Sequence, residues 1–239
     1  MTDQNVTIEV LVFDGCPHAE QALELANAVA DHFGGTSVRC VDVDDEHKAA
    51  ELGFLGSPSI RVNGQDVEGR TTTQGAMCCR TYEGGAGVPP KWMIEAAVLR
   101  ASKPHGLLFL CVANSARSQM AEGISRSMAP KDVRIWSAGS KPAEVRPETI
   151  AVLKEIGIDI SGHRSKAVEE IPAERVDTVI TLCGEEECPL FPGKAVRLHW
   201  GLSDPAAVQG GEGSRLNAFR AARDELRRRL SVVFGRQGA

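Results

Sequence analysis

The sequence predicts an α/β protein built from two units, and three observations support this prediction. The chain has 239 residues, more than one typical domain. Short apolar runs alternate with amphipathic stretches in both halves, as strands alternate with helices in α/β folds. Residues 102–106, Ser-Lys-Pro-His-Gly, interrupt that pattern with turn-forming residues and predict a linker. We therefore expect one unit at residues 1–103 and another at 104–239.

The first unit is expected to form a small α/β sandwich. Its predicted elements, in order, are strand 8–14, helix 19–33, strand 37–43, helix 47–53, a hairpin around 63–64 and helix 91–101. Apolar residues in the first helix recur at i, i+3, i+4 and i+7. Asn63-Gly64 lies between two extended runs, which is a strong signal of a two-residue hairpin. Cys40 lies in an apolar strand and is expected in the core.

The second unit alternates strands and helices more regularly. Its predicted elements, in order, are strand 107–111, helix 118–128, strand 133–139, helix 147–157, strands 176–183 and 195–200, and a basic helix 215–230. Pro147 stands at the start of a helix, where its missing N–H costs least. Nearly continuous apolar strands separated by helices predict a parallel sheet that is covered on both faces.

Composition and charge exclude several classes of function. The N-terminal residues lack the basic and apolar regions of a secretion signal, and no apolar stretch is long enough to span a membrane. We therefore expect a cytoplasmic protein with no membrane partner. Residues 1–103 carry 8 Lys and Arg against 15 Asp and Glu, whereas residues 104–239 carry 19 against 17. The second unit is thus the better host for an anion, but it has no basic footprint for nucleic acid.

The seven cysteines are expected to be reduced. They are Cys16, Cys40, Cys78, Cys79, Cys111, Cys183 and Cys188. An odd number without an export signal argues against a structural disulfide framework. In a reducing compartment, such cysteines are more often buried, metal-bound or catalytic.

Cys111 and Arg117 carry the strongest chemical signal in the chain. Cys111 ends an apolar strand, and ligands of open parallel sheets bind at the carboxyl ends of the strands. A short loop of small residues then leads into a helix, so successive amides and the helix N-terminus can face one anion. The expected oxyanion loop consists of Val112, Ala113, Asn114, Ser115, Ala116, Arg117 and Ser118. Arg117 adds a bidentate partner, and Ser118 can donate its hydroxyl to the thiolate of Cys111. The alternative is a buried structural cysteine and a surface arginine.

The segment Cys-Val-Ala-Asn-Ser-Ala-Arg-Ser at 111–118 resembles the phosphate loop of low-molecular-weight tyrosine phosphatases and thioredoxin-coupled arsenate reductases. The resemblance extends over residues 107–233 and implies the parallel-sheet fold of those enzymes. A second match, Trp-Gly-Leu-Ser-Asp-Pro-Ala at 200–206, implies that Asp204 is the general acid. Alternatively, Asp204 only caps a turn, because Asp-Pro is a common turn pair.

Cys183 and Cys188 favour a reductase over a phosphatase, because only a reductase needs further thiols. The resemblance implies that Cys111 attacks arsenate, Cys183 then attacks Cys111, and Cys188 finally attacks Cys183. Phosphate and sulfate are expected as competing anions. Two other interpretations stay open: a tyrosine phosphatase with incidental cysteines, and an arsenic or thiol sensor that only binds. The pair could also be half of a zinc site, although no partner with zinc spacing lies nearby.

The first unit resembles a thioredoxin-like or glutaredoxin-like domain. The resemblance rests on Cys16-Pro17-His18-Ala19 between strand and helix, on Ser57-Pro58 before the hairpin, and on the terminal helix. It implies that Pro58 is cis and faces the thiol of Cys16. Ala19 stands where dithiol members have their resolving cysteine. We expect a built-in redox partner, whose mixed disulfide is resolved by Cys78, by Cys79 or by a small thiol.

No tightly bound cofactor or metal is expected, and an external reductant such as thioredoxin, glutathione or mycothiol should supply electrons. Vicinal Cys78-Cys79 could instead bind a thiophilic ion such as arsenite. The family resemblance also includes a cation-stabilised variant of the oxyanion loop, whose positions match Asn114, Glu122 and Ser137. Lys166 stands where the last acidic ligand of that cation is expected, so we predict no metal there.

Overall fold

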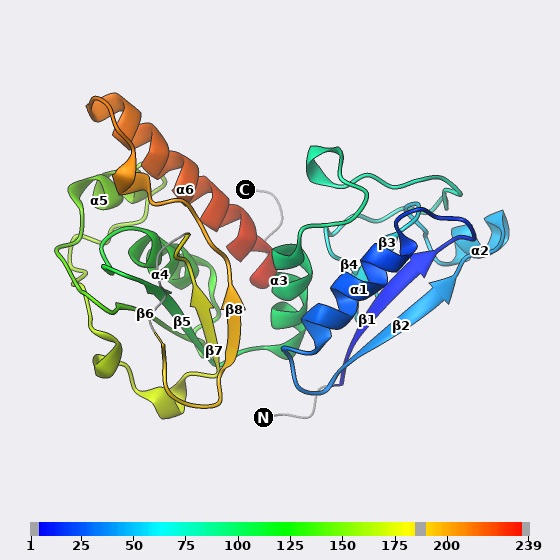
Figure 1. Cartoon of the computed structure of the whole chain (residues 1–239), viewed down its shortest axis with the longest axis horizontal. Coiled ribbons are helices and arrows are strands. Elements are labelled where there is room, and N and C mark those ends of the chain that lie inside the picture. The colour runs from blue at the N-terminus through cyan, green and yellow to red at the C-terminus, as the bar shows by residue number, and fades with distance from the viewer. Residues whose placement is uncertain (1–4, 185–189, 236–239) are drawn as a thin grey trace. The chain divides into compact units, whose positions relative to one another are not determined.

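The computed structural model describes residues 5–184 and 190–235 of the chain (Figure 1). These residues divide into two compact units, and the boundary between the units falls between Lys103 and Pro104. Both units contain a four-stranded sheet with helices packed on it. No helix within the described residues is both long and apolar enough to cross a membrane.

The sheet of the first unit has the strand order β2-β1-β3-β4. Its strands are β1 (Val6–Val12), β2 (Thr36–Asp42), β3 (Ser59–Val62) and β4 (Gln65–Asp66). β1 pairs with β2 in parallel and with β3 in antiparallel orientation. Asn63 and Gly64 have φ angles of 49° and 76°, which are the two positive values that a type I′ hairpin turn requires. The predicted hairpin between β3 and β4 is therefore confirmed.

Helices cover both faces of this sheet. They are α1 (Ala19–Ala30), α2 (Glu46–Glu51) and α3 (Lys91–Ser102), and a short 3-10 turn, η1 (Glu83–Gly85), precedes α3. α1 and α3 contact each other and the sheet. On the other face, Ala49 of α2 packs in a cluster with Leu11, Val43 and Phe54. The predicted order of strands and helices is confirmed.

Two details of the first unit differ from expectation. α1 ends at Ala30 rather than near Phe33, because the amide of Phe33 donates to Ala30 O in a tight turn while the ring stays buried. Cys40 is exposed, so the prediction that it lies in the core is wrong. β2 is an edge strand of the sheet, and its side chains have neighbouring strands on one side only.

The sheet of the second unit is fully parallel, with the strand order β6-β5-β7-β8. Its strands are β5 (Gly106–Cys111), β6 (Arg134–Gly139), β7 (Thr178–Thr181) and β8 (Val196–His199). The helices are α4 (Arg117–Met128), α5 (Pro147–Lys154) and α6 (Glu212–Val233), with short 3-10 turns η2 (Val168–Glu170), η3 (Ala173–Arg175) and η4 (Pro205–Ala207). Every residue of β5 is buried, as predicted for a central strand.

The two faces of this parallel sheet are covered differently. α4 packs against β5 and β6 and against the other two helices (Figure 1). On the opposite face, Leu108 and Leu110 pack with Val168 and Ile171, which belong to a segment without α-helix. The sheet is covered on both faces as predicted, but among the described residues α-helices cover only one of them.

Ion pairs join α6 to the residue that follows α5. Arg220 and Arg223 donate to both oxygens of Glu155, and these hydrogen bonds lower the pKa of that carboxyl to about 2. Arg223 also donates to Val152 O of α5 at 2.8 Å. α5 and α6, which both contact α4, are therefore also connected to each other.

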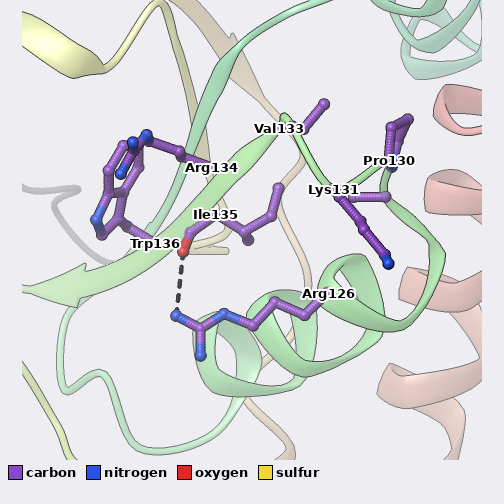
Figure 2. A pocket seen from close by; sticks show the side chains of 8 residues that line it. Arg126, Pro130, Lys131, Val133, Arg134, Ile135 and Trp136 are labelled. Atoms are coloured by element: carbon purple, nitrogen blue, oxygen red, sulfur yellow. Dashed lines mark hydrogen bonds between the residues drawn. The ribbon is translucent and has the colours of Figure 1, made fainter.

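A basic surface cavity of about 390 Å³ lies beside α4 and β6 (Figure 2). It is lined by Arg126, Ala129, Pro130, Lys131 and residues 133–136. Figure 2 shows Arg126 donating to Ile135 O, at 3.2 Å. Because Gly106 pairs with Arg134, this cavity lies at the N-terminal edge of the sheet. Cys111 ends β5 at the opposite edge, so the cavity does not include it.

Candidate active site

The oxyanion loop, residues 112–118, connects β5 to α4. The carbonyls of 112–116 all accept hydrogen bonds from elsewhere, namely from Lys141 N, Ala143 N, Ser165 Oγ, Arg146 N and Met120 N, in chain order. Within the described residues, the amides of 113–116 are donors in none of these bonds. An anion site at a helix N-terminus requires backbone amides that are available to bind the anion. In this loop the carbonyls form hydrogen bonds to other segments, which leaves the amides for that role.

Asn114 fixes the shape of this loop. It has a φ of 46°, a left-handed conformation that asparagine tolerates better than most residues, and it is fully buried. Its Oδ1 accepts from Lys166 N at 2.8 Å and from Gln119 Nε2 at 3.0 Å. Its Nδ2 donates to Ser118 Oγ and to Ser137 Oγ, both at 2.8 Å. The amide group of Asn114 is therefore fully hydrogen-bonded, and the loop is held before any anion binds.

Cys111 lies against Ser118 at the start of α4. Its Sγ is 2.9 Å from Ser118 Oγ, and the residue is only 2% exposed. Because Ser118 Oγ already accepts a hydrogen bond from Asn114 Nδ2, its own hydrogen is available to the sulfur. A hydroxyl that donates to sulfur stabilises the thiolate, which is the nucleophilic form.

Arg117, near the end of the loop, is buried. Its Nη1 donates to Leu202 O at 2.9 Å and lies 3.4 Å from Leu182 O. Its Nη2 is 3.8 Å from Asp204 Oδ1. The guanidinium therefore joins the end of β7 to the segment that carries Asp204, and places a fixed positive charge at the carboxyl end of the sheet.

Asp204 caps a turn and also lies beside Arg117. Its Oδ1 accepts from Ala206 N at 3.1 Å and so caps η4. Its side chain is also about one third exposed and lies beside Arg117. A partly exposed carboxyl group that faces an oxyanion site can exchange a proton with a bound substrate.

Cys183 is fully buried two residues after β7. Leu182 N donates to Leu110 O at 2.8 Å, which continues the pairing of β5 with β7. Cys183 therefore lies one residue beyond the position opposite Cys111 on the neighbouring strand. Cys188, the third expected relay cysteine, lies outside the described residues.

Lys166 stands beside the buried carboxylate of Glu122. Its Nζ donates to Glu122 Oε2 at 3.1 Å, and Arg126 and Ser137 Oγ also contact this carboxylate. The ammonium thus supplies positive charge next to Ser137, which in turn contacts Asn114. The described part of the chain contains no cluster of three or more His, Cys, Asp or Glu residues that could hold a metal ion.

The N-terminal redox residues lie in the first unit. Ser57-Pro58 is a cis peptide bond, and Ser57 forms an isolated parallel bridge with Cys79. Cys16 is partly buried, whereas Cys78 and Cys79 are exposed. The structure therefore brings Cys79 next to the peptide that the resemblance assigns to the thiol site.

Sequence analysis missed the residues that hold the oxyanion loop from outside. Gln119 Nε2 donates to Asn114 O and to Arg164 O, and its Oε1 lies 2.9 Å from His163 Nδ1. Ser165 Oγ donates to Asn114 O at 2.6 Å. The resemblance points to segment 163–167 only as the region of a cation ligand. The only signal in the sequence is a polar run without helical or strand periodicity. Such a run indicates a loop, but it does not indicate that this loop contacts Asn114.

Gly139 is predicted to be essential for the loop. A Cβ atom at this position would lie 2.4 Å from Val112 O and 2.8 Å from Asn114 N, and neither backbone atom can move aside. We expect Gly139→Ala to weaken phosphate binding at least about tenfold and to cost roughly 1–3 kcal/mol of stability. Titration calorimetry and urea unfolding measure the two effects. Gly162→Ala is the control, because no atom lies within 4 Å of its added Cβ. Equal phosphate affinity in the two variants would contradict this prediction.

His163 is predicted to make the stability of this unit depend on pH. Burial lowers the pKa of His163, so below about pH 6.5 the unfolded chain binds a proton that the folded chain does not. The free energy of unfolding should therefore fall as the pH drops through about 6.5, and His163→Gln should reduce this fall. Urea unfolding of both proteins at pH 8.0 and pH 5.5 checks the difference. An identical pH dependence in the two proteins would rule out His163 as its source.

The fold and this site define a class: a parallel α/β unit with a buried cysteine at the end of a central strand, before a loop that leads into a helix. Residues 106–236 match the family described as low molecular weight phosphotyrosine protein phosphatase, and the chain belongs to that family.

Curated relatives and solved structures extend this comparison. The chain is 39% identical over 128 residues to the arsenate reductase of Halalkalibacterium halodurans, which is 53% of this chain and 92% of that protein. It is 39% identical over 126 residues to the arsenate reductase of Bacillus subtilis, and the match covers 52% of this chain and 91% of that protein. A solved structure described as an arsenate reductase in the phosphate binding state is 32% identical, with a TM-score of 0.47, covering 56% of this chain and 98% of that one.

Proposed function

We propose that the protein reduces arsenate to arsenite with cysteine thiols. The observation that carries this proposal is the position of Cys111 against Ser118, at the head of a loop that is held around unpaired amides. The identity of 39% to two proteins named arsenate reductase supports the same substrate. Arsenate and phosphate are tetrahedral oxyanions of similar charge, so phosphate and sulfate should compete for the loop.

In the proposed first step, the thiolate of Cys111 attacks the arsenic atom of bound arsenate. An S–As bond forms and an As–O bond breaks. Asp204 gives a proton to the departing oxygen, which leaves as water. Arg117 and the amides of the oxyanion loop stabilise the charge that builds up on the remaining oxygens. The arsenic is still pentavalent after this step.

Electron transfer follows in the proposed second step. The thiolate of Cys183 attacks Cys111 Sγ, an S–S bond forms, and the S–As electron pair stays on arsenic, which leaves as trivalent arsenite. The thiolate of Cys188 then attacks Cys183 Sγ and releases Cys111 as a thiolate. The product is a Cys183–Cys188 disulfide, and two cysteine thiols have supplied the two electrons.

The proposed reductant of this disulfide is the N-terminal unit, with thioredoxin, glutathione or mycothiol as the external source of electrons. Linkage in one chain replaces a bimolecular encounter by an intramolecular one at high effective concentration. The resemblance of residues 16–19 and 57–58 to a thioredoxin-like site supports this role, with Cys16 as the attacking thiol.

The test compares two reactions of the full chain under a dithiol reductant. Arsenite released from arsenate is measured by chromatography, and hydrolysis of an aryl phosphate by absorbance. We expect arsenite turnover that phosphate inhibits, and a Cys183–Cys188 disulfide after one turnover without reductant. Aryl phosphate turnover far above arsenate turnover would instead assign a phosphatase. Tight arsenite binding without turnover would assign a sensor.

A further inference from the structure

Ser57 links the turn that carries Cys16 to the segment that carries Cys78 and Cys79. Its Oγ accepts from Phe13 N at 3.3 Å, and Phe13 O accepts from the amide of Cys16. On its other side, Ser57 N donates to Cys78 O at 2.8 Å. The three cysteines therefore belong to backbone segments that contact one and the same residue.

The chain after Cys79 then wraps around Pro58 and returns to the Cys16 turn. Tyr82 Oη donates to Pro58 O at 3.0 Å and accepts from Ile60 N at 3.2 Å. Further on, Gly87 packs against His18, because a Cβ atom at Gly87 would lie only 2.3 Å from the imidazole ring. Residues 78–87 therefore contact both Pro58 and the turn that holds Cys16.

A buried ion cluster fixes the backbone directly after the two adjacent cysteines. Arg80 is 3% exposed and donates to both oxygens of Asp66, at 2.6 and 2.9 Å, and to Glu68 at 2.8 Å. Its guanidinium lies 4.4 Å from the centre of the Tyr82 ring. Buried ion pairs are weak evidence for stability, and their best-attested role is to select one conformation. Here, two exposed thiols directly precede an anchored arginine.

We propose that Cys16, Cys78 and Cys79 form a second redox site, in which one of the adjacent pair resolves the mixed disulfide on Cys16. This inference rests on the proposed function and deepens it, because Ala19 has no thiol for that step. The Cys16 thiolate attacks a substrate disulfide, forms one S–S bond and releases one thiolate. A thiolate of Cys78 or Cys79 then attacks Cys16 Sγ, forms the intramolecular disulfide and releases the second thiolate.

In this reaction, two cysteine thiols of the first unit give two electrons to the substrate disulfide. The substrate disulfide is reduced to two thiols, which take up the two protons of the cysteines, and the first unit is left with one disulfide. A small-molecule thiol or a dithiol protein then reduces that disulfide.

The test uses the reduced full chain and one equivalent of 2-hydroxyethyl disulfide, without arsenate. After alkylation, peptide mapping by mass spectrometry locates every disulfide, and the released mercaptoethanol is counted. We expect a disulfide from Cys16 to Cys78 or Cys79 and two equivalents of mercaptoethanol. In the double variant Cys78→Ser/Cys79→Ser, Cys16 should keep the mixed disulfide and release one equivalent. Cys40→Ser, which removes another exposed thiol of this unit, should behave like the parent chain.

Two outcomes would overturn the proposal. One is a stable mixed disulfide on Cys16 in the parent chain. The other is protection of Cys78 and Cys79 from alkylation by arsenite together with no Cys16 disulfide, which would assign the pair to binding a thiophilic ion. Since arsenate is absent from the mapping, failure of arsenate reduction with an intact Cys16 disulfide would refute only the proposed function.

Discussion

Cys183→Ser is expected to abolish arsenite release while aryl phosphate hydrolysis stays within about twofold of the parent chain. In the proposed mechanism, both reactions need Cys111, Arg117 and the oxyanion loop, but only reduction needs a second sulfur to break the S–As bond. Serine is close to cysteine in volume, and its hydroxyl cannot take over disulfide exchange. The variant should therefore stop after the first step, with arsenic bound to Cys111.

The measurements are arsenite by chromatography and nitrophenolate by absorbance, on the same preparation. Cys111→Ser should lose both reactions, and Cys40→Ser, an exposed thiol on β2, should lose neither. Because Cys183 is fully buried, far-UV circular dichroism and urea unfolding must first show that the serine variant folds. Arsenite release by a folded Cys183→Ser protein would refute the relay.

Arg117→Lys is expected to lower kcat/KM for arsenate reduction and for aryl phosphate hydrolysis together, by roughly 10²–10³-fold. The guanidinium is planar, and it contacts Leu182 O and Leu202 O while it remains beside Asp204. A lysine ammonium is a single point charge, so it cannot bridge these carbonyls and also hold two oxygens of an anion. Both reactions share this requirement, because the anion must be bound before Cys111 attacks.

The matched control is Arg134→Lys, at the start of β6 and at the N-terminal edge of the sheet. It makes the same chemical change in the same unit, and it should leave both reactions within about twofold of the parent. Phosphate affinity by titration calorimetry separates binding from chemistry. An Arg117→Lys protein with unchanged phosphate affinity and unchanged turnover would show that Arg117 is only structural.

Much of the fold could be predicted because its signals are local. Strand and helix positions in both units follow from periodicity, and Asn63-Gly64 fixes a turn by its own φ angles. Cys111 and Arg117 could be selected because the strand, loop and helix around them are contiguous in sequence. Exposure is not a local property, and Cys40 shows this: it lies in a strand with two valines, but that strand is at the edge of the sheet.

Other parts of the site could not be predicted because they depend on contacts between distant segments. Gln119 and Ser165 hold the oxyanion loop by hydrogen bonds to Asn114. Gly139, on the neighbouring strand, has no side chain that would clash with the backbone of this loop. Local patterns around Lys166 do not indicate that its ammonium contacts Glu122, 44 positions away, and only the family resemblance places the two residues at one site.

The sequence by itself determined that a thiol and an arginine flank a short loop between a strand and a helix, because all of these features lie within eight residues. Only the tertiary structure decided which groups orient that loop, and that Ser57 lies between the segments of Cys16 and Cys79. Local periodicity reports the conformation of one segment. Hydrogen bonds between segments depend on how the sheets bring them together, and no single stretch of sequence encodes that.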